Sequence, residues 1–196
     1  MSNNVAVANV AGQTTTVKTT ETGGVHVPHH NLDGIAAGQT LIGKTGEKIF
    51  SIEVTPTVSA SPDYSTGDVV GSIMTFASPA VDAAGDFTVR GAVVRSKADI
   101  TVACDLLLFN ALPTATYTDN SAVAVGATDL AKLVGVIKFA STDATDLGTE
   151  ACLSKEANIP VKLASGNNVY GVLVARGTIN LASTSDITVM LTVRQN

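Results

Sequence analysis

The most suggestive chemistry in this sequence lies in residues 38–45, which begin with Gly38, end with Thr45 and read GQTLIGKT. They match the phosphate-binding pattern G-x-x-x-x-G-K-[ST] at every fixed position. In a nucleotide site, such a loop follows a buried strand and leads into a helix whose N-terminus faces the phosphates. Here a poor strand precedes the loop, and residues 47–52 alternate as a strand does. We interpret the segment as a hinge and keep nucleotide binding as a minor alternative.

A second group of chemically capable residues contains every histidine of the chain, namely His26, His29 and His30. Imidazoles at this spacing, with Asp33 as a fourth ligand, are able to share Zn²⁺ or Ni²⁺. A metal site needs a rigid frame, and this segment lies in a stretch with little capacity to fold by itself. We therefore expect no metal or other cofactor and interpret the segment as a partner contact, formed by Val25, His26, Val27, Pro28, His29, His30 and Asn31.

Three carboxylates, Asp143, Asp146 and Glu150, surround Gly148, and oxygen ligands this close suit Ca²⁺. The regular alternation of Asp and Asn in a calcium loop is missing, so we interpret them as a solvated turn. Any Ser-His-Asp triad or Cys-His dyad would have to use one of the three clustered histidines as its general base. The sequence therefore predicts no catalytic residues and a protein that is not an enzyme.

The two cysteines and three tyrosines offer little further chemistry. Cys104 and Cys152 each lie in an apolar stretch, which predicts two buried thiols rather than a disulfide framework. Tyr64, Tyr117 and Tyr170 are expected to be exposed and to offer rings that stack against sugars. With no Trp in the chain, carbohydrate binding is a minor alternative.

The composition restricts the kinds of partner. The chain has 12 Lys and Arg against 17 Asp and Glu, for a net charge of -5, and its basic residues are scattered. Binding to a phosphate backbone requires a basic patch, so nucleic acid is not an expected partner. No early basic residue leads into an apolar run, and no apolar run approaches the roughly 18 residues of a membrane span, so neither a signal peptide nor a membrane segment is expected.

The elements that would carry these residues divide at about residue 46. Residues 13–24 are rich in Thr and Gly, and they show no helical period and no sustained strand period. We expect residues 1–46 to be an extended N-terminal arm that becomes ordered against a partner. From residue 47 onward the apolar residues alternate, which predicts a separate β domain over residues 47–196.

Nine short strands bounded by turn signals are predicted in that domain, with one helical turn at residues 128–132. An all-β, antiparallel β-sandwich follows from so many short strands, with a jelly roll preferred over an immunoglobulin-like arrangement. The strands are expected at residues 50–54, 69–76, 87–94, 100–109, 133–139, 151–153, 159–163, 169–175 and 187–193.

Two segments of the C-terminal two thirds are distinctive: residues 105–120, which read DLLLFNALPTATYTDN, and residues 161–178, which include VKLASG and YGVLVARGT. Both resemble segments of tailed-bacteriophage structural proteins. The arm phrase GVHVPHHN at residues 24–31 is similar in character. The resemblance covers roughly residues 65–196 and part of the arm, and it implies a virion protein without catalytic residues.

Among such proteins, the size of the chain and its arm are similar to those of capsid cement, or decoration, proteins. The resemblance implies a protein made in the host cytoplasm and located on the outer capsid surface. Its partners would be the major capsid protein and itself, as a homodimer or homotrimer. A head fibre, tail or host-adhesion protein is the alternative within the same class.

Overall fold

The computed structural model describes residues 4–8, 14–22, 25–28, 48–98 and 100–195. The chain divides into two compact units, Met1–Gly46 and Glu47–Asn196. Within the described part of the chain, no helix has both the length and the apolar character needed to span a membrane.

The described part of the first unit consists of three strands: β1 (Asn4–Ala8), β2 (Thr14–Thr22) and β3 (Val25–Pro28). They form an antiparallel sheet in the order β1-β2-β3, with Val5 opposite Val17 and Thr20 opposite Val27. The sequence predicts no sustained strand here, whereas β2 is a nine-residue strand. Its run of Thr and Val residues has high β propensity, although it lacks the apolar alternation on which the prediction relied.

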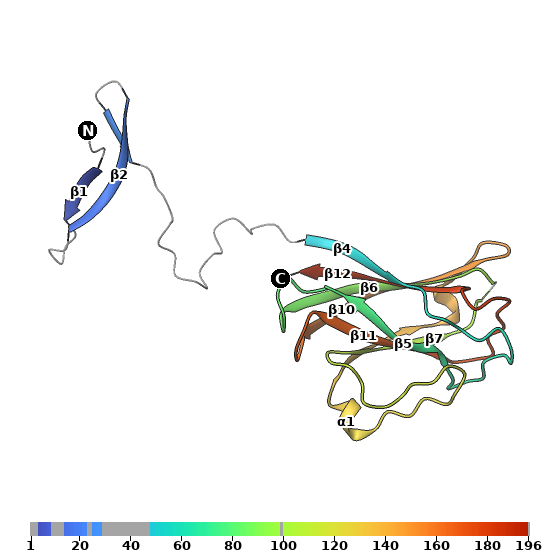
Figure 1. The fold of residues 1–196 in the computed structure, drawn as a ribbon. Helices are drawn as coiled ribbons and strands as arrows, with labels where there is room; N and C mark the ends of the chain where they lie inside the picture. The colour runs from blue at the N-terminus through green and yellow to red at the C-terminus, as the bar shows by residue number, and fades with distance from the viewer. Residues whose placement is uncertain (1–3, 9–13, 23–24, 29–47, 99, 196) are drawn as a thin grey trace. The chain divides into compact units, whose positions relative to one another are not determined.

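The second unit is a two-layer sandwich of antiparallel strands, which confirms the predicted all-β class (Figure 1). One sheet has five strands in the order β4-β12-β6-β10-β9, and the other has four in the order β5-β11-β7-β8. The strands are β4 (Lys48–Val54), β5 (Val69–Ala77), β6 (Asp86–Ser96), β7 (Cys104–Phe109), β8 (Leu133–Phe139), β9 (Ala144–Asp146), β10 (Ala151–Lys162), β11 (Asn168–Ala175) and β12 (Ile187–Gln195).

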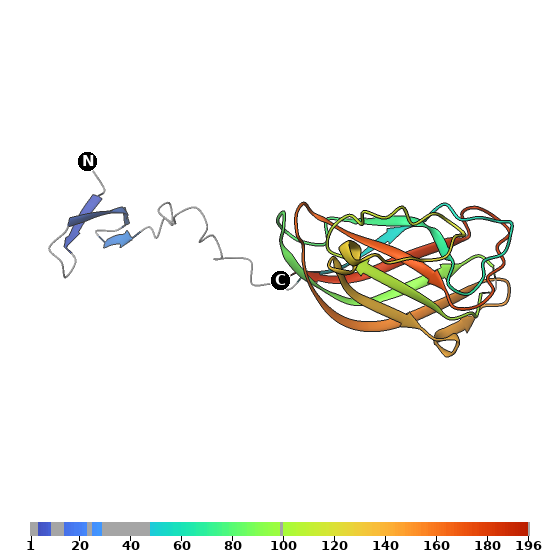
Figure 2. The same cartoon turned by 90° about the horizontal axis from the view of Figure 1, so that it is seen from below.

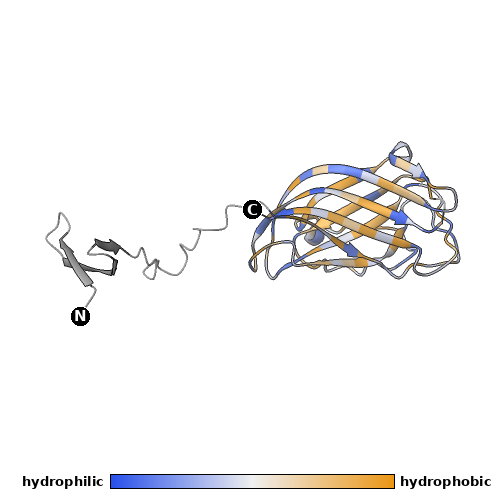
Figure 3. Ribbon diagram, turned by 90° about the horizontal axis from the view of Figure 1, so that it is seen from above, coloured by the Kyte–Doolittle hydropathy of each residue, from blue (hydrophilic) through white to orange (hydrophobic). Residues whose placement is uncertain are grey.

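Alternation of apolar and polar residues explains most of these strands. In β12, Val189, Leu191 and Val193 are fully buried, whereas the intervening residues are half-buried. Successive side chains of a strand point to opposite faces, so one face of β12 lies in the core and the other faces outward. Figure 3 shows the same alternation of apolar and polar residues along the strands of the sandwich. The core between the two sheets is therefore built from aliphatic residues with a few phenylalanines.

A second buried cluster lies on the outer face of the four-stranded sheet. Residues 110–126, here called the covering loop, cross this face after β7 (Figures 1 and 2). Their Tyr117, Ala115 and Val123 pack with Phe109 and Val172 of the sheet. The four-stranded sheet consequently has apolar contacts on both faces, which explains why all six residues of β7 are buried.

Two strand predictions need correction. Residues 151–153 and 159–163, predicted as two strands with a loop between them, belong to the single strand β10. Its pairing with β6 shifts between Glu156 and Ile159, so a bulge replaces the predicted loop. The strand predicted to begin at residue 100 begins at Cys104 instead. The predicted helical turn is α1 (Ala127–Leu130), a four-residue helix that follows the covering loop.

Candidate functional site

The predicted partner contact lies only partly within the part of the chain that the structure describes. Val25, His26, Val27 and Pro28 form β3, where His26 is the register partner of Glu21. His29, His30 and Asn31 lie outside the described residues, as do Asp33 and the phosphate-loop-like residues 38–45. These predictions therefore remain predictions.

Two of the acidic residues around Gly148, Asp143 and Asp146, have separate protein partners. Asp143 binds the Lys155 ammonium at 2.9 and 3.0 Å and accepts the Ala140 N–H at 2.8 Å. These contacts, with the Lys155 hydrogen bond the strongest, lower the pKa of Asp143 below its ordinary value. Asp146 Oδ1 accepts the Gly148 N–H at 2.6 Å. Among the described residues, no three His, Cys, Asp or Glu side chains are grouped to hold a metal ion.

The tyrosines do not form the exposed stacking surface that the carbohydrate alternative needs. Tyr64 is fully buried and Tyr117 is nearly so, which contradicts the expected exposure of both; Tyr170 is half-buried. Tyr64 instead closes a polar network, because its hydroxyl donates to Asp119 Oδ1 at 2.7 Å and accepts the Ser59 N–H at 2.6 Å. These are the contacts of a core residue, and they leave little of Tyr64 for a ligand.

The two cysteines differ from each other. Cys104 is buried in the core, as predicted, and burial raises the pKa of its thiol to about 12. Cys152 is partly exposed, so the prediction of a buried thiol is wrong for this residue. It lies on β10 opposite Arg95 of β6, on the outer side of the five-stranded sheet.

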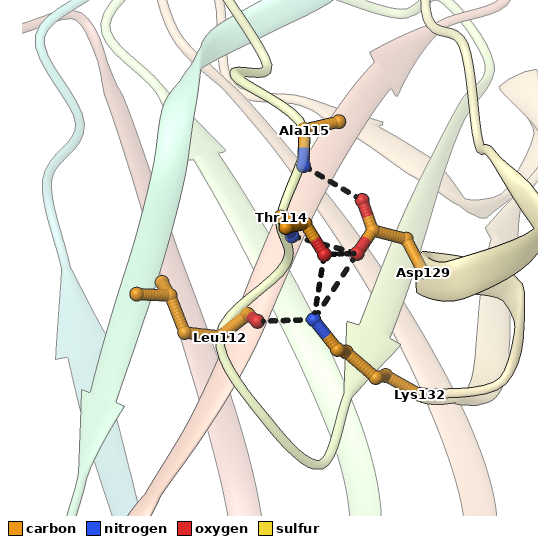
Figure 4. Close-up of polar contacts among 5 residues, drawn as sticks. All are labelled: Leu112, Thr114, Ala115, Asp129 and Lys132. Carbon is orange, nitrogen blue, oxygen red and sulfur yellow. Dashed lines mark hydrogen bonds and ion pairs between the residues drawn. The ribbon is translucent and has the colours of Figure 1, made fainter.

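A buried carboxylate, Asp129, anchors the covering loop (Figure 4). It accepts the Thr114 N–H at 2.6 Å, the Thr114 hydroxyl at 2.9 Å and the Ala115 N–H at 2.9 Å. Lys132 lies 3.3 Å from the same carboxylate and donates to the Leu112 carbonyl at 2.8 Å. These bonds tie the start of the loop to the end of α1, so the cluster stabilises the loop.

Two more aspartates hold the region in the same way. Asp119 accepts the Gly71 N–H at 2.6 Å in addition to the Tyr64 hydroxyl, and it thereby joins the loop to β5. Asp105 is buried and accepts the Arg176 guanidinium at 2.7 Å. Sequence reasoning missed these roles because nothing local marks an aspartate as buried when its partners lie far along the chain.

The five-stranded sheet presents a different outer surface, here called the open face. It is formed by the residues that alternate with the core positions, and it mixes Ser and Thr with charged and aliphatic side chains. Arg95 forms an ion pair with Glu53 across the face and contacts the Met190 sulfur at 3.5 Å. The two buried clusters of the described residues lie between the sheets and under the covering loop. The open face comprises Ile49, Ser51, Glu53, Val93, Arg95, Cys152, Ser154, Thr188, Met190, Thr192 and Arg194.

The open face is irregular along one line. The register between β6 and β12 shifts at Thr192 and Val193, and both strands that flank β6 skip Arg90. Arg90 donates to Asn158 Oδ1 of the bulged β10 at 2.8 Å. A depression of about 370 Å³ lies here, lined by residues that include Arg90, Glu156, Thr192 and Ile49. Bulges redirect side chains, so the open face departs from a flat surface along this line.

No protein-family model, curated protein or solved structure matches the chain. The geometry of the two sheets therefore carries the functional argument.

Proposed function

We propose that this chain is a structural protein of a tailed-phage virion. In this proposal it is a capsid cement, or decoration, protein that bridges and stabilises subunits of the major capsid protein. It would lie on the outer capsid surface and have no catalytic role. We further propose that the sandwich is a jelly roll. With the three-residue β9 set aside, the eight long strands follow the orders 1-8-3-6 and 2-7-4-5, which supports two interleaved Greek keys.

The contrast between the two outer faces is the observation that carries the proposal. The chain covers the outer face of its four-stranded sheet with its own loop and fixes that loop through Asp129 and Asp119. On the open face, the described residues of the second unit leave Ser51, Glu53 and Ser154 exposed. A sandwich with a complete core and one unoccupied sheet face suits a protein that binds other proteins over a wide, shallow surface.

The segments that resemble phage structural proteins occupy one part of the fold. Residues 105–120 form β7 and the start of the covering loop, and residues 161–178 include β11, which pairs with β7. Asn110 connects the two segments, because its side chain donates to the Lys162 carbonyl at 3.0 Å and its carbonyl accepts the Ala164 N–H at 3.1 Å. The resemblance therefore concerns the scaffold behind the open face.

The two units suggest how binding would be divided. In the proposal, Val25–Pro28 and the residues that follow contact a neighbouring subunit, while the open face contacts the shell beneath it. Each contact is modest, since ordering a segment on binding costs conformational entropy. Two linked contacts raise the overall affinity, because the second contact forms at high effective concentration.

Imaging of purified particles tests the location. Gold-labelled antibodies against the chain are expected on the capsid of the phage that encodes it. Labelling confined to the tail, or no labelling of intact particles, would contradict the proposal and favour the tail or adhesion alternative.

Binding of purified protein to particles stripped of it tests the two contacts. Deletion of residues 1–46 is expected to leave a folded sandwich and abolish shell binding. Thr192→Lys, on the open face, is expected to weaken binding at least tenfold. Thr118→Lys, an equal change at an exposed position of the covering loop, is the matched control and is expected to bind normally. Equal binding by the truncated and intact proteins would refute the role of the arm.

A further inference from the structure

Each of the two sheets has two edge strands, here called its margins. An edge strand carries backbone N–H and C=O groups that no neighbouring strand satisfies. The margins of the five-stranded sheet are β4 and β9, and those of the four-stranded sheet are β5 and β8. Soluble proteins usually block such margins, because a long and regular one pairs readily with another chain. The four margins differ in how far the described residues block them.

The margin at β5 is occupied by the covering loop. The Val69 N–H donates to the Ser121 carbonyl at 2.9 Å, and the Asn120 N–H donates to the Val69 carbonyl at 2.8 Å. Farther along β5, the Gly71 N–H donates to Asp119 Oδ1 at 2.6 Å. The loop thus takes the place of a neighbouring strand over the first part of β5.

The margins at β9 and β8 are short or irregular. β9 has three residues, and the part of β10 that extends past it carries the bulge and Pro160, which has no N–H to donate. On β8, the register with β7 breaks between Leu108 and Phe109, and Lys138 is exposed. Short strands, bulges, prolines and lysines are the features that prevent edge-to-edge pairing.

β4 has seven residues with no bulge and no proline, and its one lysine, Lys48, is its first residue. All seven of its residues pair with β12 in an unbroken register, and no proline or glycine interrupts them (Figure 1). Its core-facing Phe50 and Ile52 remain only half-buried, whereas Leu191 and Val193 of the adjacent strand are fully buried. Ile49 is 60% exposed. A further strand beside β4 would satisfy its free backbone groups and cover these apolar side chains.

We propose that the β4 margin pairs antiparallel with β4 of a second copy of this chain, about a two-fold axis at Ser51. This register is the one that uses all seven residues of both strands. It sets Phe50 opposite Ile52 of the partner subunit, which extends the core-facing apolar row across the interface. Ile49 then faces Glu53 of the partner subunit and Lys48 faces Val54 of the partner subunit, so no like charges are opposed. A shift that centres the axis on Glu53 would bring two carboxylates together.

The resulting interface joins two five-stranded sheets into one continuous sheet of ten strands, with both open faces on the same side. Two-fold pairing of identical strands is an isologous contact, which closes at the dimer and does not propagate into fibres. The inference rests on the proposed function for its purpose, a bridge across a junction of the shell. The dimer itself can be tested on the purified protein without any capsid.

Disulfide trapping tests the register. In a Cys152→Ser background, Ser51→Cys is expected to give a covalent dimer under mild oxidation, because directly opposite residues in an antiparallel pair have Cα atoms about 4.5–5.5 Å apart, within the range of a disulfide. Thr192→Cys in the same background is the matched control, since Thr192 is the register partner of Ser51 on the next strand inward. It is expected to remain monomeric on a denaturing gel.

Sedimentation of the full-length protein gives the second readout. The unmodified chain is expected to be a dimer. Ser51→Lys is expected to raise the dissociation constant of this dimer at least tenfold, so that the variant sediments mainly as a monomer. Ser154→Lys, which adds the same charge at an exposed position of β10, is expected to remain dimeric. Near-native circular dichroism of the variants excludes unfolding as the cause.

A monomeric unmodified chain would overturn the inference. So would a dimer in which Ser51→Cys fails to cross-link, because its interface would then lie elsewhere, on residues 1–46 or on the open face. A dimer that does not bind capsids would refute the proposed function and leave the β4 pairing intact.

Discussion

The Asp129 carboxylate receives two hydrogen bonds from Thr114, one from its backbone N–H and one from its hydroxyl. The side chain of Asp129 is 3% exposed, so these bonds replace nearly all of its hydration. The Ala115 N–H and the Lys132 ammonium donate the remaining hydrogen bonds to this carboxylate. The charged group is thus held stably beneath a loop that has no regular secondary structure for most of its length. The covering loop is therefore fixed by a small number of strong, charge-assisted bonds.

Asp129→Asn is expected to destabilise the sandwich by about 2–4 kcal/mol. The amide retains one acceptor oxygen and places an NH₂ group opposite the N–H of Thr114 or Ala115, and the Lys132 ammonium loses its counter-charge. Urea unfolding followed by circular dichroism measures the change. Asp63→Asn makes the same substitution at an exposed position and is expected to change stability by less than about 0.5 kcal/mol. Similar losses in the two variants would contradict the role assigned to Asp129.

The same carboxylate makes stability depend on pH. The Thr114 N–H, with further help from Ala115 and Lys132, lowers the pKa of Asp129 below its ordinary value, so the folded protein binds this proton less readily than the unfolded chain. The stabilisation is then complete above the unfolded pKa of about 4 and is lost as the pH falls below it. Urea midpoints measured from pH 6 to pH 2 are expected to fall, and to fall less steeply in Asp129→Asn.

Asp143 acts in the same direction, since Lys155 and the Ala140 N–H lower its pKa as well. Asp143→Asn provides the comparison that separates the two groups. If Asp129→Asn shows the same pH slope as the unmodified protein, titration of Asp129 is not a source of the acid sensitivity.

Gly71 and Gly67 form a matched pair for testing backbone strain. Both have positive φ, at 80° and 96°, but a Cβ at position 71 would lie 2.7 Å from the Pro56 Cβ, whereas nothing lies within 4 Å of one at position 67. Gly67→Ala is expected to cost about 1–2 kcal/mol from conformation. Gly71→Ala adds overpacking and is expected to cost about 3 kcal/mol or more. Thermal unfolding of both variants measures the difference, and equal losses would show that Pro56 moves away without cost.

The two thiols are expected to react at different rates. Cys104 is buried, and its thiol has a pKa raised to about 12, so little reactive thiolate is accessible; Cys152 is partly exposed. A thiol reagent such as DTNB at pH 8 is therefore expected to label one cysteine in the native protein and two in urea. Rapid labelling of both thiols in the native protein would indicate that the sheet opens around β7.

The elements that could be predicted from sequence are those whose local pattern reflects their burial. β4 and β12 are half-buried, and their alternation of apolar and polar residues placed both to within two residues. β7 was placed less well, because both of its faces are covered and an apolar run gives no period to mark where the strand begins. The start of the strand depends on its pairing with β11 and β8, which the local sequence does not record.

β10 was divided into two because its middle reads as a loop. Glu156, Asn158 and Pro160 are polar or strand-breaking, and they sit where a bulge accommodates them at the margin of the sheet. In the first unit, the residues of β2 gave no apolar alternation, although their propensity for extended structure was visible. In both places, the prediction relied on a regular alternation of apolar residues. A sheet is also able to include irregular or polar strands that lack this alternation.

The polar clusters of the candidate site had no sequence signature at all. Asp119 is bonded to Tyr64, 55 residues away, and Asp105 to Arg176, 71 residues away. Each of these side chains resembles an ordinary solvated residue until the fold brings its partner beside it. The prediction that Tyr64 and Tyr117 are exposed is wrong for the same reason. Tyr64, for example, is buried by elements that are distant from it in the sequence.

The pairing of β4 with β12 also governs how the sandwich assembles. Thr55 and Thr188, whose hydroxyls meet at 2.9 Å across these strands, are 133 residues apart. Closing so long a loop is entropically costly, and sheets built from such distant partners form slowly. β4 cannot pair into its sheet until β12 has formed. Refolding from urea should therefore pass through a phase in which β4 is accessible to proteases and to other partly folded copies.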